Sequence, residues 1–336
     1  MLKKILLMIL GLLVGAVLVI WIGAAASLDY DRTYSAAVAE LPLFNTDEAS
    51  GSTIHLSLIE SGGMEFRART AGFGGTRGNV ILLHGFPESS AMWVPIIPAL
   101  AAAGYQVVAF DQRGYSPGAR PESVSDYTMD KLTSDVLGIA DAVGFEKFHL
   151  LGHDWGSAVG WSLVFQDSSR VQTWTSLSIP HLLAYGEAIQ NDPDQQSRSS
   201  YILFFMMPWI PEQLFAFNDL GLMRNVMYAE HSSATIDEYL ALFHEPVAIS
   251  AALNWYRAGG ISAAADDLTA IVEIPVLFIW GNADPVVGAT ALEVQRGYFH
   301  GPFKEIELDA GHWLMESQAQ TITAAVLTHL QDHSEG

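Results

Sequence analysis

One short turn constrains the fold of this chain more than any other segment. A strand-like apolar run at residues 148–151 leads directly into Gly152-His153-Asp154-Trp155-Gly156-Ser157. Small residues two positions before and two positions after Asp154 permit a sharp strand-to-helix turn that exposes the aspartate side chain. The pattern therefore predicts a nucleophile elbow at the end of a β-strand, with Asp154 as the nucleophile.

The identity of that side chain selects the chemistry. A serine that attacked a saturated carbon would form an ether, which a water activated by histidine cannot cleave. A carboxylate that attacks the same carbon forms an ester, which water hydrolyses. Asp154 therefore indicates displacement at a saturated carbon, such as the carbon of an epoxide or an alkyl halide, and not ordinary ester hydrolysis.

The composition is typical of a globular enzyme. The 336 residues are enough for one large α/β domain with an insertion, and half of them are hydrophobic. A formal net charge of −21 disfavours nucleic acid and anionic membrane surfaces as partners. The chain has no cysteine, and its eleven histidines show no metal-binding spacing such as HExxH. We therefore expect neither a metal nor a cofactor.

The first residues form a segment distinct from the body of the chain. Lys3 and Lys4 precede an uncharged apolar run over residues 5–26, and its 22 residues suffice to cross a bilayer as a helix. The run exceeds the usual apolar region of a cleavable signal, although Ala24-Ala25-Ala26-Ser27 would also serve as a cleavage site. The sequence predicts a membrane anchor at residues 1–27 with the enzyme on the non-cytoplasmic side. The alternative is a secreted or periplasmic protein after cleavage.

After a connector at residues 28–52, strands and helices alternate. Continuous apolar strands alternating with helices predict a mostly parallel sheet covered on both faces. Helices are expected at residues 128–143, 157–165 and 322–330. The expected strands are Thr53–Ile59, Met64–Thr70, Val80–Leu83, Tyr105–Phe110, His149–Gly152, Trp174–Ile179, Val276–Trp280 and Glu305–Leu308.

The alternation is interrupted after Pro180. The following stretch is rich in Met, Phe, Trp and Tyr, and it contains no strand-like run bounded by turns. We predict a helical cap at residues 181–268, seated over the carboxyl ends of the strands, where ligands bind in open α/β sheets. The predicted core then comprises residues 53–180 and 269–336.

Chain order supplies two further catalytic candidates, because an acid and then a histidine follow an elbow of this type. Asp284 lies at the tip of a predicted strand, in Gly281-Asn282-Ala283-Asp284, and His312 lies just beyond the next strand. We expect His312 to be the base that activates water against the ester, and Asp284 to orient its ring. Asp309 is an alternative acid, although three residues before His312 is a poor position for reaching the ring.

A second turn borders the predicted site. His84-Gly85-Phe86-Pro87-Glu88 ends the strand at residues 80–83. The backbone N–H groups of Phe86 and Trp155 are the expected donors to the oxyanion that develops when water attacks the ester. The same turn also fits a tight turn with a cis-proline.

Five motifs together resemble the α/β-hydrolase-fold epoxide hydrolases. They are HGFPES at 84–89, DQRGY at 111–115, GHDWG at 152–156, GNAD at 281–284 and GHW at 311–313. The resemblance runs from about Thr53 to the carboxyl end, and it implies an α/β-hydrolase fold with an inserted helical cap, here behind an N-terminal hydrophobic helix. It departs after Arg113-Gly114-Tyr115, where the family more often continues with glycine, an acid and serine; no expected catalytic residue lies there.

In that family two cap tyrosines act on the epoxide oxygen, and this chain has matching contexts. Tyr201 opens YILFF, and Tyr256 lies in LNWYR. A proton donor is needed because the leaving alkoxide stays in the product and leaves poorly unless it is protonated or hydrogen-bonded. The resemblance therefore implies an epoxide hydrolase, in which Asp154 attacks the oxirane carbon while Tyr201 and Tyr256 polarise its oxygen. A small apolar epoxide and water would be the substrates, and a vicinal diol the product.

Two other functions stay open. A haloalkane dehalogenase shares the aspartate elbow, but it needs a second halide donor, and Phe86 stands where an asparagine often supplies it. The other is a catalytically inactive, membrane-tethered binding protein of the same fold. The acid, base, nucleophile and tyrosine candidates that this chain retains argue against that function.

Overall fold

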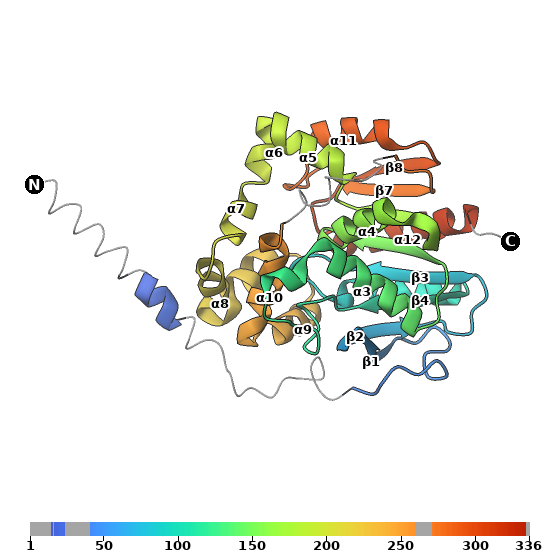
Figure 1. Cartoon of the computed structure of the whole chain (residues 1–336), viewed down its shortest axis with the longest axis horizontal. Coiled ribbons are helices and arrows are strands. Elements are labelled where there is room, and N and C mark those ends of the chain that lie inside the picture. The colour runs from blue at the N-terminus through green and yellow to red at the C-terminus, as the bar shows by residue number, and fades with distance from the viewer. Residues whose placement is uncertain (1–14, 16, 24–40, 260–270, 334–336) are drawn as a thin grey trace, which may run out of the picture.

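An eight-stranded, mostly parallel sheet forms the centre of the protein in the computed structural model (Figure 1). The structure describes residues 15, 17–23, 41–259 and 271–333. The predicted α/β fold class is confirmed. The strands are β1 (His55–Ser61), β2 (Met64–Ala71), β3 (Gly78–Leu83), β4 (Tyr105–Phe110), β5 (Phe148–His153), β6 (Val171–Leu177), β7 (Val276–Gly281) and β8 (Phe303–Leu308).

The order of the strands fixes where a ligand can bind. They are arranged β1-β2-β4-β3-β5-β6-β7-β8; β1 and β2 are antiparallel to their neighbours, and all pairs from β4 onwards are parallel. The chain direction across the sheet reverses around β3, which lies between β4 and β5. The carboxyl ends of β3 and β5 therefore flank the switch point at which open α/β sheets bind their ligands.

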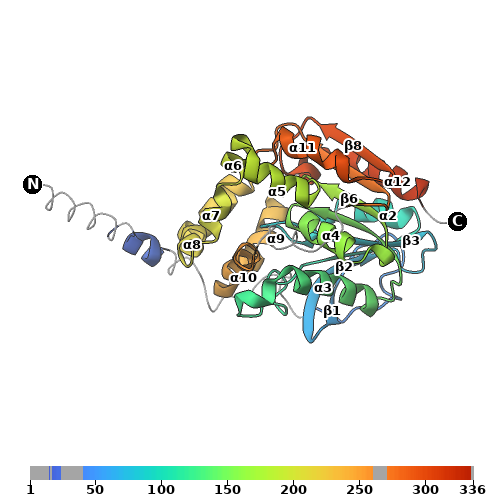
Figure 2. The same cartoon turned by 45° about the horizontal axis from the view of Figure 1, so that its top comes forward.

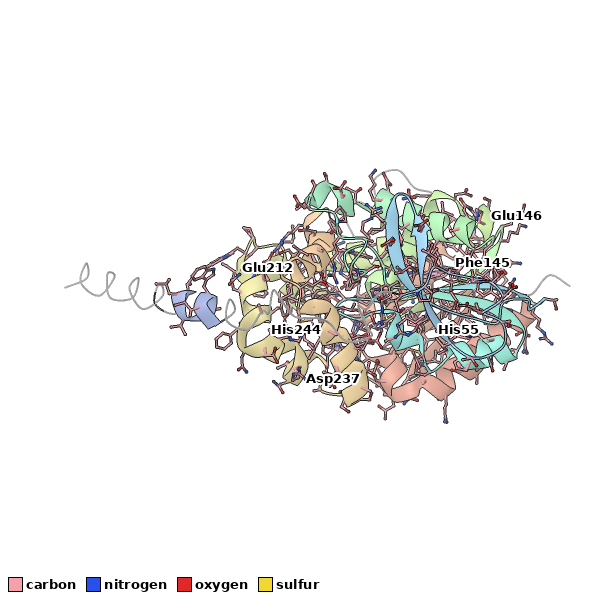
Figure 3. The ribbon with its side chains drawn as sticks, turned by 90° about the horizontal axis from the view of Figure 1, so that it is seen from below. His55, Phe145, Glu146, Glu212, Asp237 and His244 are labelled. Carbon is pink, nitrogen blue, oxygen red and sulfur yellow. The ribbon has the colours of Figure 1, made fainter. Side chains whose placement is uncertain are left out.

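Helices cover both faces of the sheet, which explains why its central strands are apolar throughout. All six residues of β5 are buried. In a strand with one face in water, buried and exposed residues would alternate. Figure 3 shows the sheet from below, with α3 (Met129–Ala142) and α4 (Trp155–Gln166) on one side and α12 (Leu314–Asp332) on the other. Two short helices complete this cover: α2 (Ile97–Ala102) and α11 (Ala289–Gln295).

A run of helices lies between β6 and β7, where the sequence predicts a cap. Figures 1 and 2 show these helices beside the sheet, towards the left of both views. Tyr256 of this insertion packs edge-on against Phe86 and Trp155, which follow β3 and β5. The insertion therefore lies over the carboxyl ends of these strands. It comprises α5 (Leu182–Asn191), α6 (Pro193–Arg198), α7 (Tyr201–Phe205), α8 (Ile210–Leu222), a π-helix (Met223–Met227), α9 (Ser233–Phe243) and α10 (Pro246–Arg257).

The exact division into connector, core and cap stays a prediction of the sequence. The proposed cap boundary near residue 268 and the first part of the connector, residues 28–40, lie outside the described residues. The described part of the connector lies along the first hairpin, where Leu43 bridges to Leu58 and Ser50 bridges to Phe73.

The expectation of an N-terminal membrane anchor is wrong. Among the described residues, no helix combines the length and the apolar character that a bilayer span requires. Of the apolar run at 5–26, the structure describes residues 15 and 17–23. Residues 5–14, 16 and 24–26 of that run lie outside the described part.

The contact between α4 and the sheet gives a stability test. A Cβ atom added at Gly160 would lie 2.0 Å from the Trp174 ring, whereas one added at Gly186 meets no atom within 4 Å. We expect Gly160→Ala to lower the free energy of unfolding by about 1–3 kcal/mol through overpacking. Gly186→Ala should raise it by about 0.5–1 kcal/mol, because alanine loses less backbone entropy in a helix. Urea unfolding measures both, and a stabilising Gly160→Ala would contradict this packing.

Candidate active site

The elbow forms because three backbone segments come into direct contact. A Cβ atom at Gly152 would lie 2.5 Å from the carbonyl oxygen of Gly156, and one at Gly156 would lie 2.2 Å from that of Leu83. Only glycine fits either position. Asp154, between β5 and α4, has φ 50° and ψ −119°, a conformation that costs an L-residue free energy and that the surrounding packing must maintain.

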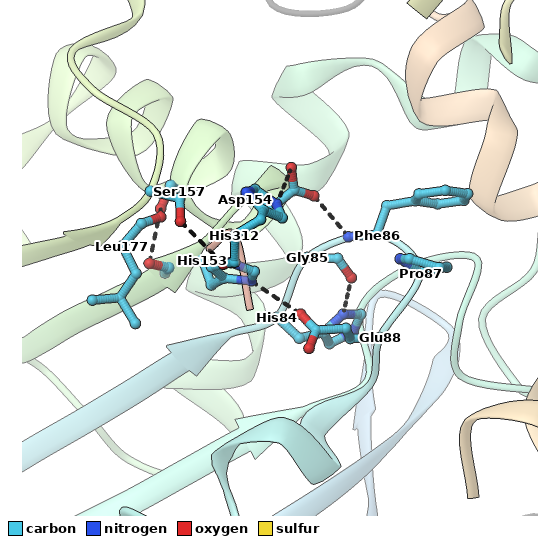
Figure 4. Close-up of polar contacts among 12 residues, drawn as sticks. His84, Gly85, Phe86, Pro87, Glu88, His153, Asp154, Ser157, Leu177 and His312 are labelled. Carbon is cyan, nitrogen blue, oxygen red and sulfur yellow. Dashed lines mark hydrogen bonds and ion pairs between the residues drawn. The ribbon is translucent and has the colours of Figure 1, made fainter. Parts of the chain in front are cut away.

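The two carboxylate oxygens of Asp154 have different surroundings (Figure 4). Oδ1 accepts a hydrogen bond of 2.8 Å from the backbone N–H of Phe86, and Oδ2 lies 3.6 Å from His312 Nε2. Trp155, the other expected oxyanion donor, makes no hydrogen bond to Asp154 among the described residues. As the first residue of α4, its N–H has no acceptor within the helix and is available to an oxyanion. One carboxylate oxygen is thus held by the backbone, while the other faces the imidazole.

His312 and Asp284 come together at the ends of the adjacent strands β8 and β7. His312 Nδ1 lies 2.9 Å from Asp284 Oδ2, and Asp284 Oδ1 accepts a 2.7 Å hydrogen bond from the N–H of Val286. Because a carboxylate faces Nδ1, that nitrogen carries a proton, which leaves Nε2 directed at Asp154. Asp309 is exposed, so the structure places Asp284 and not Asp309 against the ring.

Burial and charge act in opposite directions on this pair. Burial favours neutral His312, but the charges and hydrogen bonds of Asp284 and Asp154 outweigh it and raise its pKa well above the ordinary value. Burial likewise opposes ionisation of Asp284, but His312 and the N–H of Val286 hold the pKa of Asp284 below its usual range. Asp154, His312 and Asp284 therefore form a carboxylate–imidazolium–carboxylate row.

Tyr201 and Tyr256 lie on the same cavity as Asp154. Their ring centres are 6.4 Å apart, and Tyr256 packs edge-on against Trp155 at 4.9 Å and Phe86 at 5.4 Å. Removal from water raises the pKa of both phenols well above 10, and the nearby Asp154 charge adds to this. Both tyrosines therefore remain protonated and can donate a hydrogen bond into the cavity.

The cavity itself has a volume of about 390 Å³, the size of a small-molecule site. Its walls are mainly apolar, with a few polar groups. Besides Asp154, Trp155, Tyr201 and Tyr256, it is lined by Ala158, Ile179, Tyr185, Ile189, Gln196, Ser199, Ser200, Ile202, Leu203, Met206 and Gly259. Such walls favour a small apolar ligand.

Two residues that contact His312, His153 and Ser178, were not singled out from the sequence. The carbonyl oxygen of His312 lies 3.0 Å from His153 Nε2 and accepts a 3.3 Å hydrogen bond from Ser178 Oγ. Ser178 follows β6 with φ 68°. Both residues lie at strand ends, and this position could have marked them in the sequence: His153 ends β5, in the elbow, and Ser178 follows β6. Their contact with His312 forms only in the folded sheet.

Comparison with known proteins agrees with this geometry. A family model described as the α/β hydrolase fold matches residues 78–200. Epoxide hydrolase A of Mycobacterium tuberculosis is 33% identical over 315 residues, covering 81% of this chain and 96% of the relative. Epoxide hydrolase 4 of Homo sapiens is 29% identical, covering 87% of this chain and 83% of the relative.

A solved structure gives the same result. The crystal structure of epoxide hydrolase A from Mycobacterium thermoresistibile superposes with a TM-score of 0.67 at 29% identity, covering 83% of this chain and 98% of that one. The resemblance carried by the five sequence motifs is thereby confirmed. The chain belongs to the α/β-hydrolase-fold epoxide hydrolase family.

Proposed function

We propose that the protein hydrolyses a small apolar epoxide to a vicinal diol through a covalent ester on Asp154. One observation carries the proposal: Asp154 lies in an apolar cavity, between His312 and two protonated tyrosines that line the same cavity. The names of the relatives agree with this activity. A dehalogenase would have no use for two phenols above the nucleophile.

The first half-reaction opens the ring. Asp154 attacks one oxirane carbon through Oδ2, the oxygen without a backbone donor, and the carbon–oxygen bond of the ring breaks. The departing oxygen takes a proton from Tyr201 or Tyr256 and becomes a hydroxyl group. Oδ1 stays on the N–H of Phe86 and becomes the carbonyl oxygen of the ester.

Formation of the ester prepares the base for the second half-reaction. The negative charge of Asp154 is one cause of the raised pKa of His312, and alkylation removes it. His312 is then more easily deprotonated: its Nε2 proton passes through solvent to the tyrosinate left by ring opening, so that Nε2 can take a proton from water. Asp284 stabilises the imidazolium that forms.

Hydrolysis follows at the ester carbonyl. The water oxygen attacks this carbon, and the oxyanion at Oδ1 is stabilised by the N–H of Phe86, with that of Trp155 available as a second donor. The acyl–oxygen bond then breaks, the departing oxygen takes the second proton of the attacking water, and the diol leaves with the former Oδ2 of Asp154. Asp154 is again a carboxylate and His312 again an imidazolium, so water and epoxide are consumed one for one.

An isotope experiment tests the ester. A single turnover of an aromatic epoxide in ¹⁸O-water should place the label in the peptide that carries Asp154, because the diol takes its second oxygen from the protein. Mass spectrometry of the digested protein measures this, and the peptide with the exposed carboxylate of Asp309 serves as the internal control. In His312→Gln the unlabelled alkyl-enzyme should accumulate. Rapid diol formation without label at Asp154 would exclude the ester mechanism.

The tyrosines are tested by removing both hydroxyl groups. We expect Tyr201→Phe with Tyr256→Phe to slow ring opening by about 100-fold or more, because no proton donor remains for the alkoxide. Rapid-quench measurement of the alkyl-enzyme isolates this step. Tyr127→Phe is the matched control, since its hydroxyl donates to the carbonyl of Pro121 at 2.7 Å, away from the cavity. Ring opening at the wild-type rate in the double variant would favour a dehalogenase-like reaction.

The raised pKa of His312 makes a prediction about pH. Because the folded protein binds this proton more tightly than the unfolded chain, the ion pairs stabilise the fold fully below about pH 6.5, and this contribution is lost as pH rises through the folded pKa. NMR titration of the imidazole should show a clear fall of its pKa in Asp284→Asn. The pKa of His149, which burial lowers to about 4, should not change in this variant. An unchanged pKa of His312 would mean that Asp284 does not control the charge of the imidazole.

A further inference from the structure

A buried row of charged side chains runs from α12, through the helical insertion, to the backbone of the catalytic base. It begins at Glu316 of α12, whose Oε1 lies 3.2 Å from His231 Nε2, in the loop before α9. His231 Nε2 is also 3.7 Å from Glu88 Oε1, in the turn after β3. Glu88 Oε2 lies 3.0 Å from His153 Nδ1, and His153 Nε2 lies 3.0 Å from the carbonyl oxygen of His312 (Figure 4).

This row has almost no access to water. The side chains of His231 and Glu88 are 0% exposed, that of His153 is 1% exposed, and that of Glu316 is 11% exposed. The rings of Tyr228, Tyr239 and Trp313 surround His231, with centres 5.3, 5.8 and 5.3 Å from it. Because buried carboxylates are costly without a counter-charge, Glu88 and Glu316 require a cation between them.

Hydrogen-bonding partners identify the protonation state of His153, and the two carboxylates that lie 3.2 and 3.7 Å from Nε2 indicate that of His231. Both ring nitrogens of His153 face acceptors, the Glu88 carboxylate and the His312 carbonyl oxygen, so both carry protons and the ring is a cation. Burial alone would lower the pKa of His231, but Glu316 and Glu88 raise it to about 9. Burial would raise the pKa of Glu88, yet His153 and His231 lower it to about 2. Two imidazolium groups therefore flank one carboxylate.

We propose that His231 is a positioning residue for the reaction, which acts on the base His312 through Glu88 and His153. The inference rests on the proposed function. As a cation of the insertion, His231 holds Glu88 in place, and Glu88 holds His153 against the backbone of the catalytic loop. Seating of the insertion over the sheet thereby sets the environment of the base, although His231 itself does not line the cavity.

The effect on the base follows from charge. The charged neighbours of His312 are Asp284, Asp154 and His153. His153 in turn faces Glu88. His231 faces the carboxylates of Glu88 and Glu316 and the rings of Tyr228 and Tyr239. The positive charges of His153 and His231 offset the carboxylates beside the base and help Nε2 to release its proton. Loss of the His231 cation makes the row more negative, so His312 keeps its proton to a higher pH.

The test is the pH dependence of alkyl-enzyme hydrolysis, measured in single turnovers of an aromatic epoxide with the full chain. In His231→Gln, the acidic limb of the rate should move to higher pH by about half a unit. In Glu316→Gln, which removes a negative charge, it should move to lower pH. His244→Gln is the matched control: His244 pairs with Asp219 at 2.7 Å within the same insertion (Figure 3), and its loss should leave the limb in place.

The outcomes separate this inference from the proposed function. An unmoved limb in His231→Gln, or shifts of both variants in the same direction, would overturn it, because a purely structural role would not follow the sign of the charge. If His231→Gln does not fold, the direction of the shift in Glu316→Gln decides. If the wild-type protein hydrolyses no epoxide, the proposed function fails, and NMR titration of His312 in the same variants still tests the coupling by the same signs.

Discussion

The site depends on the contact between the backbones of β3, β5 and the first turn of α4. Gly152 and Gly156 allow the segments to approach to distances that no side chain permits, and this approach keeps Asp154 in its strained conformation. The turn after β3 lies beside it, so the N–H of Phe86 reaches the carboxylate. A bulkier residue at either glycine would separate Asp154 from its hydrogen-bond donor, and the other groups of the site are arranged around that pair.

The sheet then brings the remaining groups to the same edge. Asp284 follows β7 and His312 follows β8, and parallel strands place their carboxyl ends together. The insertion covers this edge with phenols and apolar side chains. Positive and negative groups therefore face each other in a volume from which most water is excluded, where each charge acts strongly on its neighbour.

Much of this arrangement was predictable because it is local in sequence. Asp154 and Asp284 each follow an apolar strand, and His312 follows the alternating strand β8; the topology of the sheet brings these strand ends together. Tyr201 and Tyr256 required the resemblance to a family, since nothing in their own neighbourhood distinguishes them from core aromatics. Their catalytic roles, like the role of the elbow, stay predictions until they are measured.

Other features were beyond the sequence for identifiable reasons. The contact of His231 with Glu88 and Glu316 joins three segments that only the seated insertion brings together, and no spacing rule connects them. The predicted N-terminal anchor rested on hydropathy, and no helix among the described residues is long and apolar enough to span a bilayer. The sequence thus predicts which residues lie at strand ends, but it does not predict the contacts between side chains of different layers.

The position of the insertion between β6 and β7 also orders events during synthesis. A nascent chain that has emerged as far as residue 259 carries the elbow, the donor turn and both phenols, but neither Asp284 nor His312. Under the proposed mechanism, such a chain would carry the parts for ring opening without the parts for ester hydrolysis. Turnover would then be the last property that the growing chain acquires, once β8 and the following His312 have emerged.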